Sequence, residues 1–96
     1  MPAYLVVYCL LTDPARYEDY KLKAKPIVEQ FGGEYLARGG TTTVKEDDLW
    51  TPTRMVLIRF PSSAQAEAFY QSAEYQAVLG ISKASAKRTV FFLEGM

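Results

Sequence analysis

The chain has 96 residues, of which 49% are hydrophobic and 23% charged. This composition fits one globular domain over residues 1–96 and argues against intrinsic disorder. Eleven Lys and Arg balance eleven Asp and Glu, and a chain with zero net charge has no general attraction for nucleic acid or anionic lipid. We therefore expect neither nucleic acid nor a membrane among its partners.

Missing residue types restrict the chemistry further. The chain has no histidine, which excludes Ser-His-Asp and Cys-His catalytic pairs and every His-ligated metal site. Cys9 is the only cysteine, so neither an intramolecular disulfide nor a thiolate zinc cluster can form. We expect no metal and no cofactor. Residues 1–11 are apolar but lack the basic region and cleavage site of a signal peptide, and no apolar run approaches the ~18 residues of a membrane span. A cytoplasmic location is the expectation.

The first third of the chain predicts a strand followed by a helix. Residues 3–11 are apolar at nearly every position, which is typical of a strand covered on both faces. Asp13 suits the N-cap of the next helix and Pro14 its first position. Apolar residues then recur at steps of three and four up to Phe31. Pro26 is expected to kink this helix, and Gly32-Gly33 to end it.

Two further strands are predicted in the middle of the chain. Residues 34–38 form the second strand, followed by two glycines, an extended segment over 41–44 and a polar loop over 45–52. Residues 54–60 form the third strand, and alternation divides it into two faces. Met55, Leu57 and Arg59 share one face, and Val56, Ile58 and Phe60 share the other.

The last third predicts a second helix and a fourth strand. Ser62 and Gln65 form the S-x-x-Q pattern of a capping box. Ser72 indicates a fresh helix start, with a short continuation that buries Tyr75. Residues 87–94 are apolar through their centre and form the last strand.

The order of these elements is strand-helix-strand-strand-helix-strand. Two right-handed crossovers place both helices on one face of a four-stranded antiparallel sheet, an α+β ferredoxin-like fold with the first and third strands central. The helices cover one face only, yet residues 3–11 are apolar on both. A bare apolar face and an uncharged edge strand favour aggregation. We therefore expect a homodimer in which two sheets pair face to face.

The chain also resembles a known family. The residues that carry the resemblance are Tyr35-Leu36-Ala37-Arg38-Gly39-Gly40, Phe60-Pro61-Ser62, Ala66, Phe69-Tyr70, Ser72 and Glu74-Tyr75-Gln76. Through these residues the chain resembles the domain of unknown function family thirteen-thirty, and the resemblance covers essentially the whole chain. The resemblance implies a dimeric α+β barrel, a superfamily that includes cofactor-independent monooxygenases and muconolactone-type isomerases. It implies a scaffold and leaves the reaction open.

Arg38 is the strongest candidate for a functional residue. It ends the second predicted strand before Gly39-Gly40, where a ligand can approach the backbone closely. A guanidinium there could bind a carboxylate or enolate oxygen in bidentate fashion, which also makes Gly39 a candidate. The alternative is an ion pair with Glu34, Glu94 or an acid of a partner chain. Glu94 is a candidate general base only if it is buried near Arg38.

Aromatic and hydroxyl side chains supply the other candidates. Phenol groups between the sheet and the helices could act as acids or hydrogen-bond donors, although aromatic residues at helical spacing are more often core. Ser72 fits a helix cap better than a pocket hydroxyl, and Trp50 fits a dimer seam slightly better than a ligand mouth. The ligand-binding candidates of this group are Tyr20, Tyr70, Ser72, Tyr75 and Trp50.

Two functions remain open at this point. One is a cofactor-independent enzyme, monooxygenase- or isomerase-like, that acts on a small aromatic or carboxylate metabolite; it depends on the resemblance and on Arg38. The other is a non-catalytic dimeric module that binds a small ligand or a protein. RNA binding is disfavoured because residues 54–60 lack the glycine and exposed aromatics of an RNP1-type strand. Neither the substrate nor the reaction type follows from the sequence.

Overall fold

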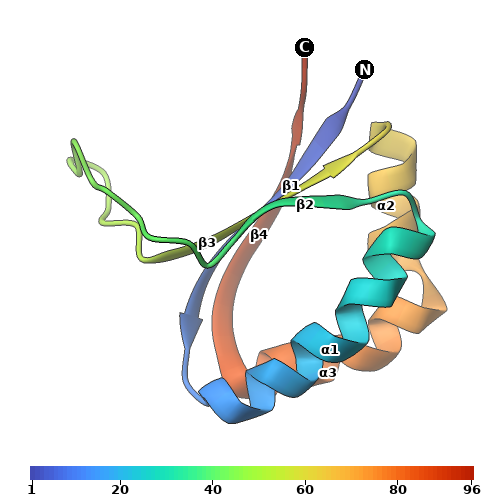
Figure 1. The fold of residues 1–96 in the computed structure, drawn as a ribbon, viewed down its shortest axis with the longest axis horizontal. Coiled ribbons are helices and arrows are strands. Elements are labelled where there is room, and N and C mark those ends of the chain that lie inside the picture. Colours follow the sequence, from blue (N-terminus) through green and yellow to red (C-terminus); the bar gives the residue numbers. More distant parts are fainter.

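A computed structural model describes all 96 residues and has one layer of helices on one face of a twisted sheet (Figure 1). The sheet order β2-β3-β1-β4 is antiparallel throughout and makes β1 and β3 central, which confirms the predicted topology. No helix has the length and apolar character needed to span a membrane. The elements are β1 (Ala3–Leu11), α1 (Pro14–Gln30), β2 (Glu34–Arg38), β3 (Arg54–Phe60), α2 (Ser63–Gln71), α3 (Ala73–Ser85) and β4 (Ala86–Glu94).

Alternation along the strands separates an inner face, under the helices, from an outer face. On β1 the inner residues Ala3, Leu5, Val7 and Cys9 are at most 4% exposed and form the centre of the core. The same alternation on β3 buries Val56, Ile58 and Phe60, as predicted from the sequence. The core therefore lies entirely between the inner face and the helices.

Helix α1 begins as its sequence predicts. The Asp13 carboxylate accepts a hydrogen bond from the Arg16 backbone N–H at 3.2 Å, and Pro14 occupies the first turn. The helix continues through Pro26 to Gln30 as a single element. Pro26 offers no N–H to the carbonyl of Leu22 one turn earlier, and the exposed position of Leu22 leaves that carbonyl open to water.

The second helical region is divided at Ser72, as predicted, but its second part is longer than the expected short continuation. The Ser72 hydroxyl donates to the Phe69 carbonyl at 2.7 Å and accepts from the Tyr75 N–H at 3.1 Å, so one side chain ends α2 and begins α3. Helix α3 then runs for 13 residues. The predicted capping box is half formed: the Ser62 hydroxyl accepts from the Gln65 N–H, but the Gln65 amide donates to the Phe31 carbonyl instead of reaching back.

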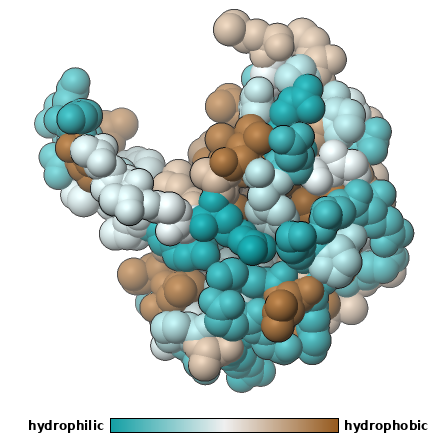
Figure 2. Space-filling model, viewed as in Figure 1, coloured by the Kyte–Doolittle hydropathy of each residue, from teal (hydrophilic) through white to brown (hydrophobic).

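A long loop over residues 39–53 connects β2 to β3 and stands away from the rest of the chain (Figures 1 and 2). The extended segment expected over residues 41–44 is not a strand. No other strand lies beside it, and its one side-chain hydrogen bond runs from Thr42 to the Thr53 carbonyl. Leu49 near the tip is 92% exposed.

The outer face of the sheet carries an apolar surface with nothing packed on most of it. Strand pairing aligns Leu57, Val6 and Phe91 in one row across β3, β1 and β4, and Tyr8 lies nearby on β1. The indole of Trp50 covers part of this face, with its ring centroid 4.9 Å from that of Tyr8.

Candidate functional site

A pocket lies between α1 and the inner face of the sheet. Its cavity volume is about 30 Å³, room for one or two water molecules, and ten of its 14 lining residues are hydrophobic. Val7 and Val56 form part of the sheet wall, and Tyr17 and Tyr20 line it from α1. The lining, mostly apolar with a few convergent polar groups, is typical of a small-molecule site, although the volume is smaller than that of most such sites.

Three of the five arginines in the chain line this pocket, and strand register explains how two of them meet. Cys9 on β1 pairs with Arg54 on β3 and with Arg88 on β4. The three residues form one cross-strand row on the inner face, so both guanidinium groups extend under α1.

A β-bulge brings in the third arginine. Tyr35 and Arg38 are three residues apart on β2, so a regular strand would place them on opposite faces. The register shift at Leu36 places both opposite inner residues, Ile58 and Val56. The guanidinium of Arg38 lies 4.8 Å from the centre of the Tyr35 ring, and both side chains line the pocket.

Arg88 is partly buried and lines both this pocket and a neighbouring surface hollow. Its Nη2 donates to the Tyr75 hydroxyl at 3.2 Å, and its guanidinium lies 5.1 Å from the centre of the Tyr20 ring. The hydroxyls of Tyr20 and Tyr75 are hydrogen-bonded to each other at 2.7 Å. The Nε and Nη1 atoms of Arg88 are buried and have no hydrogen-bond partner. Unpaired buried donors of this kind are rare in proteins and require an explanation.

The titration of these groups leaves the pocket positively charged at neutral pH. Burial raises the pKa of Tyr20 well above its ordinary value, with a further contribution from Tyr75, and burial raises the pKa of Tyr17 to about 12. Burial alone would lower the pKa of Arg88, but the oxygens of Tyr20, Tyr75 and Tyr17 outweigh it and the pKa is raised. The phenols of Tyr17 and Tyr20 are therefore neutral, and Arg88 is cationic.

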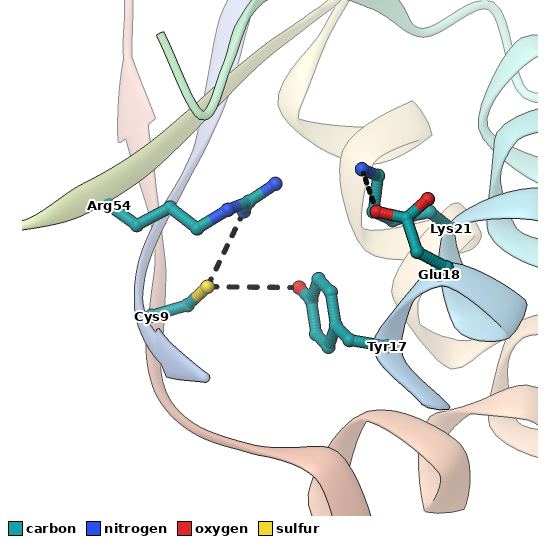
Figure 3. A network of polar contacts seen from close by, with 5 residues as sticks. All are labelled: Cys9, Tyr17, Glu18, Lys21 and Arg54. Atoms are coloured by element: carbon teal, nitrogen blue, oxygen red, sulfur yellow. Dashed lines mark hydrogen bonds and ion pairs between the residues drawn. The ribbon is translucent and has the colours of Figure 1, made fainter. Parts of the chain in front are cut away.

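Cys9 lies between Arg54 and Tyr17 beside the pocket (Figure 3). Arg54 Nη1 donates to the thiol sulfur at 3.5 Å, and the thiol contacts the Tyr17 hydroxyl at 4.0 Å. The guanidinium of Arg54 also lies 5.5 Å from the centre of the Tyr17 ring. The Arg54 guanidinium also lies close to Gly39, where an added Cβ would come within 2.9 Å of its Nη2.

No carboxylate forms an ion pair with these arginines. The three ion pairs of the chain all lie within α1 and all involve lysines. Glu18, near the pocket mouth, pairs with Lys21 at 2.9 Å, and the hydrogen bond from Lys21 lowers the pKa of that carboxylate (Figure 3). The pocket therefore presents cations and neutral phenols to any ligand, a combination that suits an anion.

The structure brings together some of the residues singled out from the sequence and separates others. Arg38, Tyr20 and Tyr75 line the pocket, and Gly39 with φ +69° supports Arg54 at its edge. Ser72 caps α3 and so positions the helix that carries Tyr75.

Three other candidates lie elsewhere in the chain. Tyr70 contacts Tyr75 but lines a neighbouring surface hollow, which shares Arg88 with the pocket, and Trp50 lies over the outer face. Glu94 pairs with Ala3, at the end of the sheet away from the pocket, so within one chain it is not near Arg38 and does not meet the condition for a base.

Sequence reasoning missed Arg54 and Arg88. The alternation of β3 already placed Arg54 on the face of Val56 and Ile58, and Arg88 shares a face with Val90 and Phe92 in the same way. A charged residue at the end of a buried face is therefore the signal that could have found both.

Comparison with known proteins identifies the family. The model of the family Domain of unknown function (DUF1330) matches residues 2–96. The chain belongs to this family. No curated protein matches its sequence significantly.

Solved structures similar to this DUF1330 member agree on the fold. A protein of unknown function from Rhodopseudomonas palustris has a TM-score of 0.78 at 14% identity and covers 99% of this chain and 82% of its own. SnoaB, a cofactor-independent oxygenase from Streptomyces nogalater, has a TM-score of 0.69 at 11% identity, over 99% of this chain and 93% of its own. A dimeric ferredoxin-like protein of unknown function from Jannaschia has a TM-score of 0.64 at 17% identity, over 99% of this chain and 100% of its own. At these identities the similarity shows the ferredoxin-like fold alone.

Proposed function

We propose that this protein is a homodimeric, cofactor-independent enzyme whose pocket binds a small organic anion. The observation that carries the proposal is Arg88, a partly buried cation with two buried, unpaired nitrogen atoms in a pocket whose lining has no carboxylate. A buried charge is costly unless it has a partner, and a bound anion would provide one.

The chemistry that fits the pocket is the formation and stabilisation of an oxyanion. Removal of a proton from a carbon next to a carbonyl gives an enolate, and cationic or phenolic donors lower its energy when they are fixed in place beforehand. An isomerase returns the proton to another carbon, and an oxygenase lets the enolate react with dioxygen. The similarity to SnoaB supports this class of reaction.

The homodimer is supported by the outer face of the sheet. Phe91 and Leu93 are 46% and 57% exposed on β4, next to the outer residues of β1. Contiguous apolar surface of this kind marks an interaction site in a soluble protein. A fold neighbour, the Jannaschia protein, is described as dimeric.

The second candidate function is a non-catalytic module that binds the same anion. It is favoured by the lack of a carboxylate or histidine in the pocket lining, because an enolising enzyme ordinarily places a base next to the reacting carbon. Binding then occurs without turnover.

Phenylpyruvate, an enolisable aromatic carboxylate, tests the proposal. We expect it to raise the melting temperature of the wild type and to exchange its C3 hydrogen with deuterated solvent faster than in buffer. Arg88→Met should abolish both effects, while Arg16→Met, an equal loss of charge on the exposed side of α1, should change neither. Binding without faster exchange would support the non-catalytic module. If no small carboxylate changes the melting temperature of the folded wild type, the anion site does not exist.

A further inference from the structure

We infer that the pocket holds its ligand at two separate anion positions, and this inference rests on the proposed function. An inner position at Tyr20, Tyr75 and Arg88 takes a single enolate or phenolate oxygen. An outer position at Arg38 and Arg54 takes a carboxylate. The substrate class is therefore a small hydroxyarene or enol that also carries a carboxylate.

The inner position has more hydrogen-bond donors than acceptors. The two phenols share one hydrogen bond, which uses one of their two protons, whichever oxygen donates. Arg88 donates to the Tyr75 oxygen, so it supplies no acceptor for the remaining proton. The hydrogen bonds of the two hydroxyls give that proton no acceptor, and the Nε and Nη1 atoms of Arg88 have no partner either. A ligand oxygen that carries negative charge satisfies this set, whereas a donor or a cation does not.

The walls of the inner position suit the oxygen of a flat ring. Tyr20 and Tyr75 contribute ring surfaces as well as hydroxyls. The ring centre of Phe69 lies 4.4 Å from that of Tyr75. Leu5 and Val7 close the sheet side. Aromatic rings pack favourably on such walls, and a phenolate or enolate spreads its charge into the ring system, so it loses less hydration energy on burial than a carboxylate.

The outer position lies where water is accessible. Arg38 is exposed and Arg54 is half-buried, and the two residues are the last of β2 and the first of β3. Both act electrostatically on the same carboxylate, that of Glu18, and the Arg54 guanidinium lies against Gly39, the neighbour of Arg38. Two guanidinium groups in this arrangement suit a carboxylate, which can keep part of its hydration there.

Strand pairing sets the distance between the two positions. Arg54 and Arg88 lie on either side of Cys9, so two strand spacings, roughly 10 Å, separate their Cα atoms. Tyr17 and Tyr20, with ring centres 5.1 Å apart, line the space from the helix side. A six-membered ring between the two anion positions requires the lining side chains to move apart, because the cavity volume between them is about 30 Å³.

Three nitroaromatic probes test this arrangement: 4-hydroxy-3-nitrobenzoate, 2-nitrophenol and 3-nitrobenzoate. The first carries both anionic groups and each of the others carries one. Nitrophenolate absorbs visible light, so a pH titration reports the ionisation of the bound hydroxyl directly. We expect the wild type to bind the two-group probe at least tenfold more tightly than either control, and to increase the ionisation constant of its hydroxyl at least tenfold.

Substitutions should separate the two positions. Arg88→Met should abolish the change in ionisation, and Tyr75→Phe should reduce it. Arg38→Met should weaken binding of the two-group probe about tenfold while leaving the ionisation change intact and the affinity for 2-nitrophenol unaltered. Arg16→Met is the control. Circular dichroism verifies that each variant is folded.

The possible failures are distinguishable. If 3-nitrobenzoate binds as tightly as the two-group probe and depends on Arg88, the inner position holds a carboxylate; the two-position inference is then wrong and the anion pocket stands. If the bound hydroxyl stays protonated, the inference is also wrong. If the folded wild type binds none of the three probes, the anion pocket itself is refuted.

Discussion

Arg88 lowers the stability of the fold, because the residue is partly buried and two of its buried nitrogen atoms have no hydrogen-bond partner. Replacing it with Met keeps much of the volume and removes the unpaired charge. We expect Arg88→Met to increase the free energy of unfolding by about 1–2 kcal/mol, measured by urea denaturation. Arg16→Met on the exposed side of α1 should change it little. A large loss of stability in Arg88→Met would mean that Arg88 is a structural residue.

The buried phenols make the fold sensitive to alkali. In the unfolded chain a phenol loses its proton near pH 10, whereas in the folded protein Tyr17 keeps its proton to about pH 12 and Tyr20, whose pKa is also raised, keeps its proton as well. Over this range the unfolded state binds fewer protons than the folded state, so the free energy of unfolding falls as pH rises. Urea denaturation between pH 10 and about 12 should show this decline.

Substitutions assign the alkaline decline to the pocket. Tyr20→Phe removes one buried phenol and should make the decline less steep. Tyr4→Phe, on the outer face, is the matched control. Equal slopes in the wild type and in Tyr20→Phe would contradict the assignment.

The connection between α1 and β2 depends on a glycine that has no room for a side chain. A Cβ at Gly33 would lie 2.5 Å from Val28 Cγ1 and 2.9 Å from Phe60 Cε1. In contrast, a Cβ at Gly80 within α3 meets nothing within 4 Å. We expect Gly33→Ala to lower the free energy of unfolding by about 1–3 kcal/mol and Gly80→Ala to raise it by about 0.5–1 kcal/mol. Thermal or urea denaturation measures both, and equal effects would refute the steric explanation.

At the element scale, local signals in the sequence predicted most of the fold. Caps at Asp13, Ser62 and Ser72 and the alternation in residues 54–60 are short-range features, and the structure has them where the sequence placed them. The bulge at Leu36 left no comparable signal, because it is defined by pairing with β3. The segment at 41–44, predicted to be extended, does not join the sheet, because β propensity produces a strand only where a partner strand is available.

The pocket was less predictable than the elements. Arg38 was found because two glycines follow it, whereas Arg54 and Arg88 are 34 residues apart and meet only through the register of three strands. The phenol pair of Tyr20 and Tyr75 likewise joins α1 to α3 over 55 residues. Such convergence depends on tertiary packing and has no local pattern in the sequence.

At the scale of the whole molecule, the outer face predicts association. Phe91 lies in the cross-strand row with Val6 and Leu57 and has no partner within the chain to cover it. We expect Phe91→Asp to convert a dimer into a monomer in light scattering after size-exclusion chromatography, because a carboxylate would be buried without a partner at the interface. Leu22→Asp, at a 75% exposed position on α1, is the control and should remain dimeric. A monomeric wild type would refute the homodimer.

The distribution of charge has a consequence for how a ligand arrives. Three of the eleven basic residues are arginines that line the pocket. The rest of the molecule therefore carries eleven acidic side chains and eight basic ones. An anion in solution therefore meets a weakly repulsive exterior and is attracted only within a Debye length of the pocket mouth. Association should proceed without long-range steering, so stopped-flow rates should change little with ionic strength. Large polyanions are excluded by the same distribution, since they would have to approach the acidic exterior before any part of them could reach the arginines.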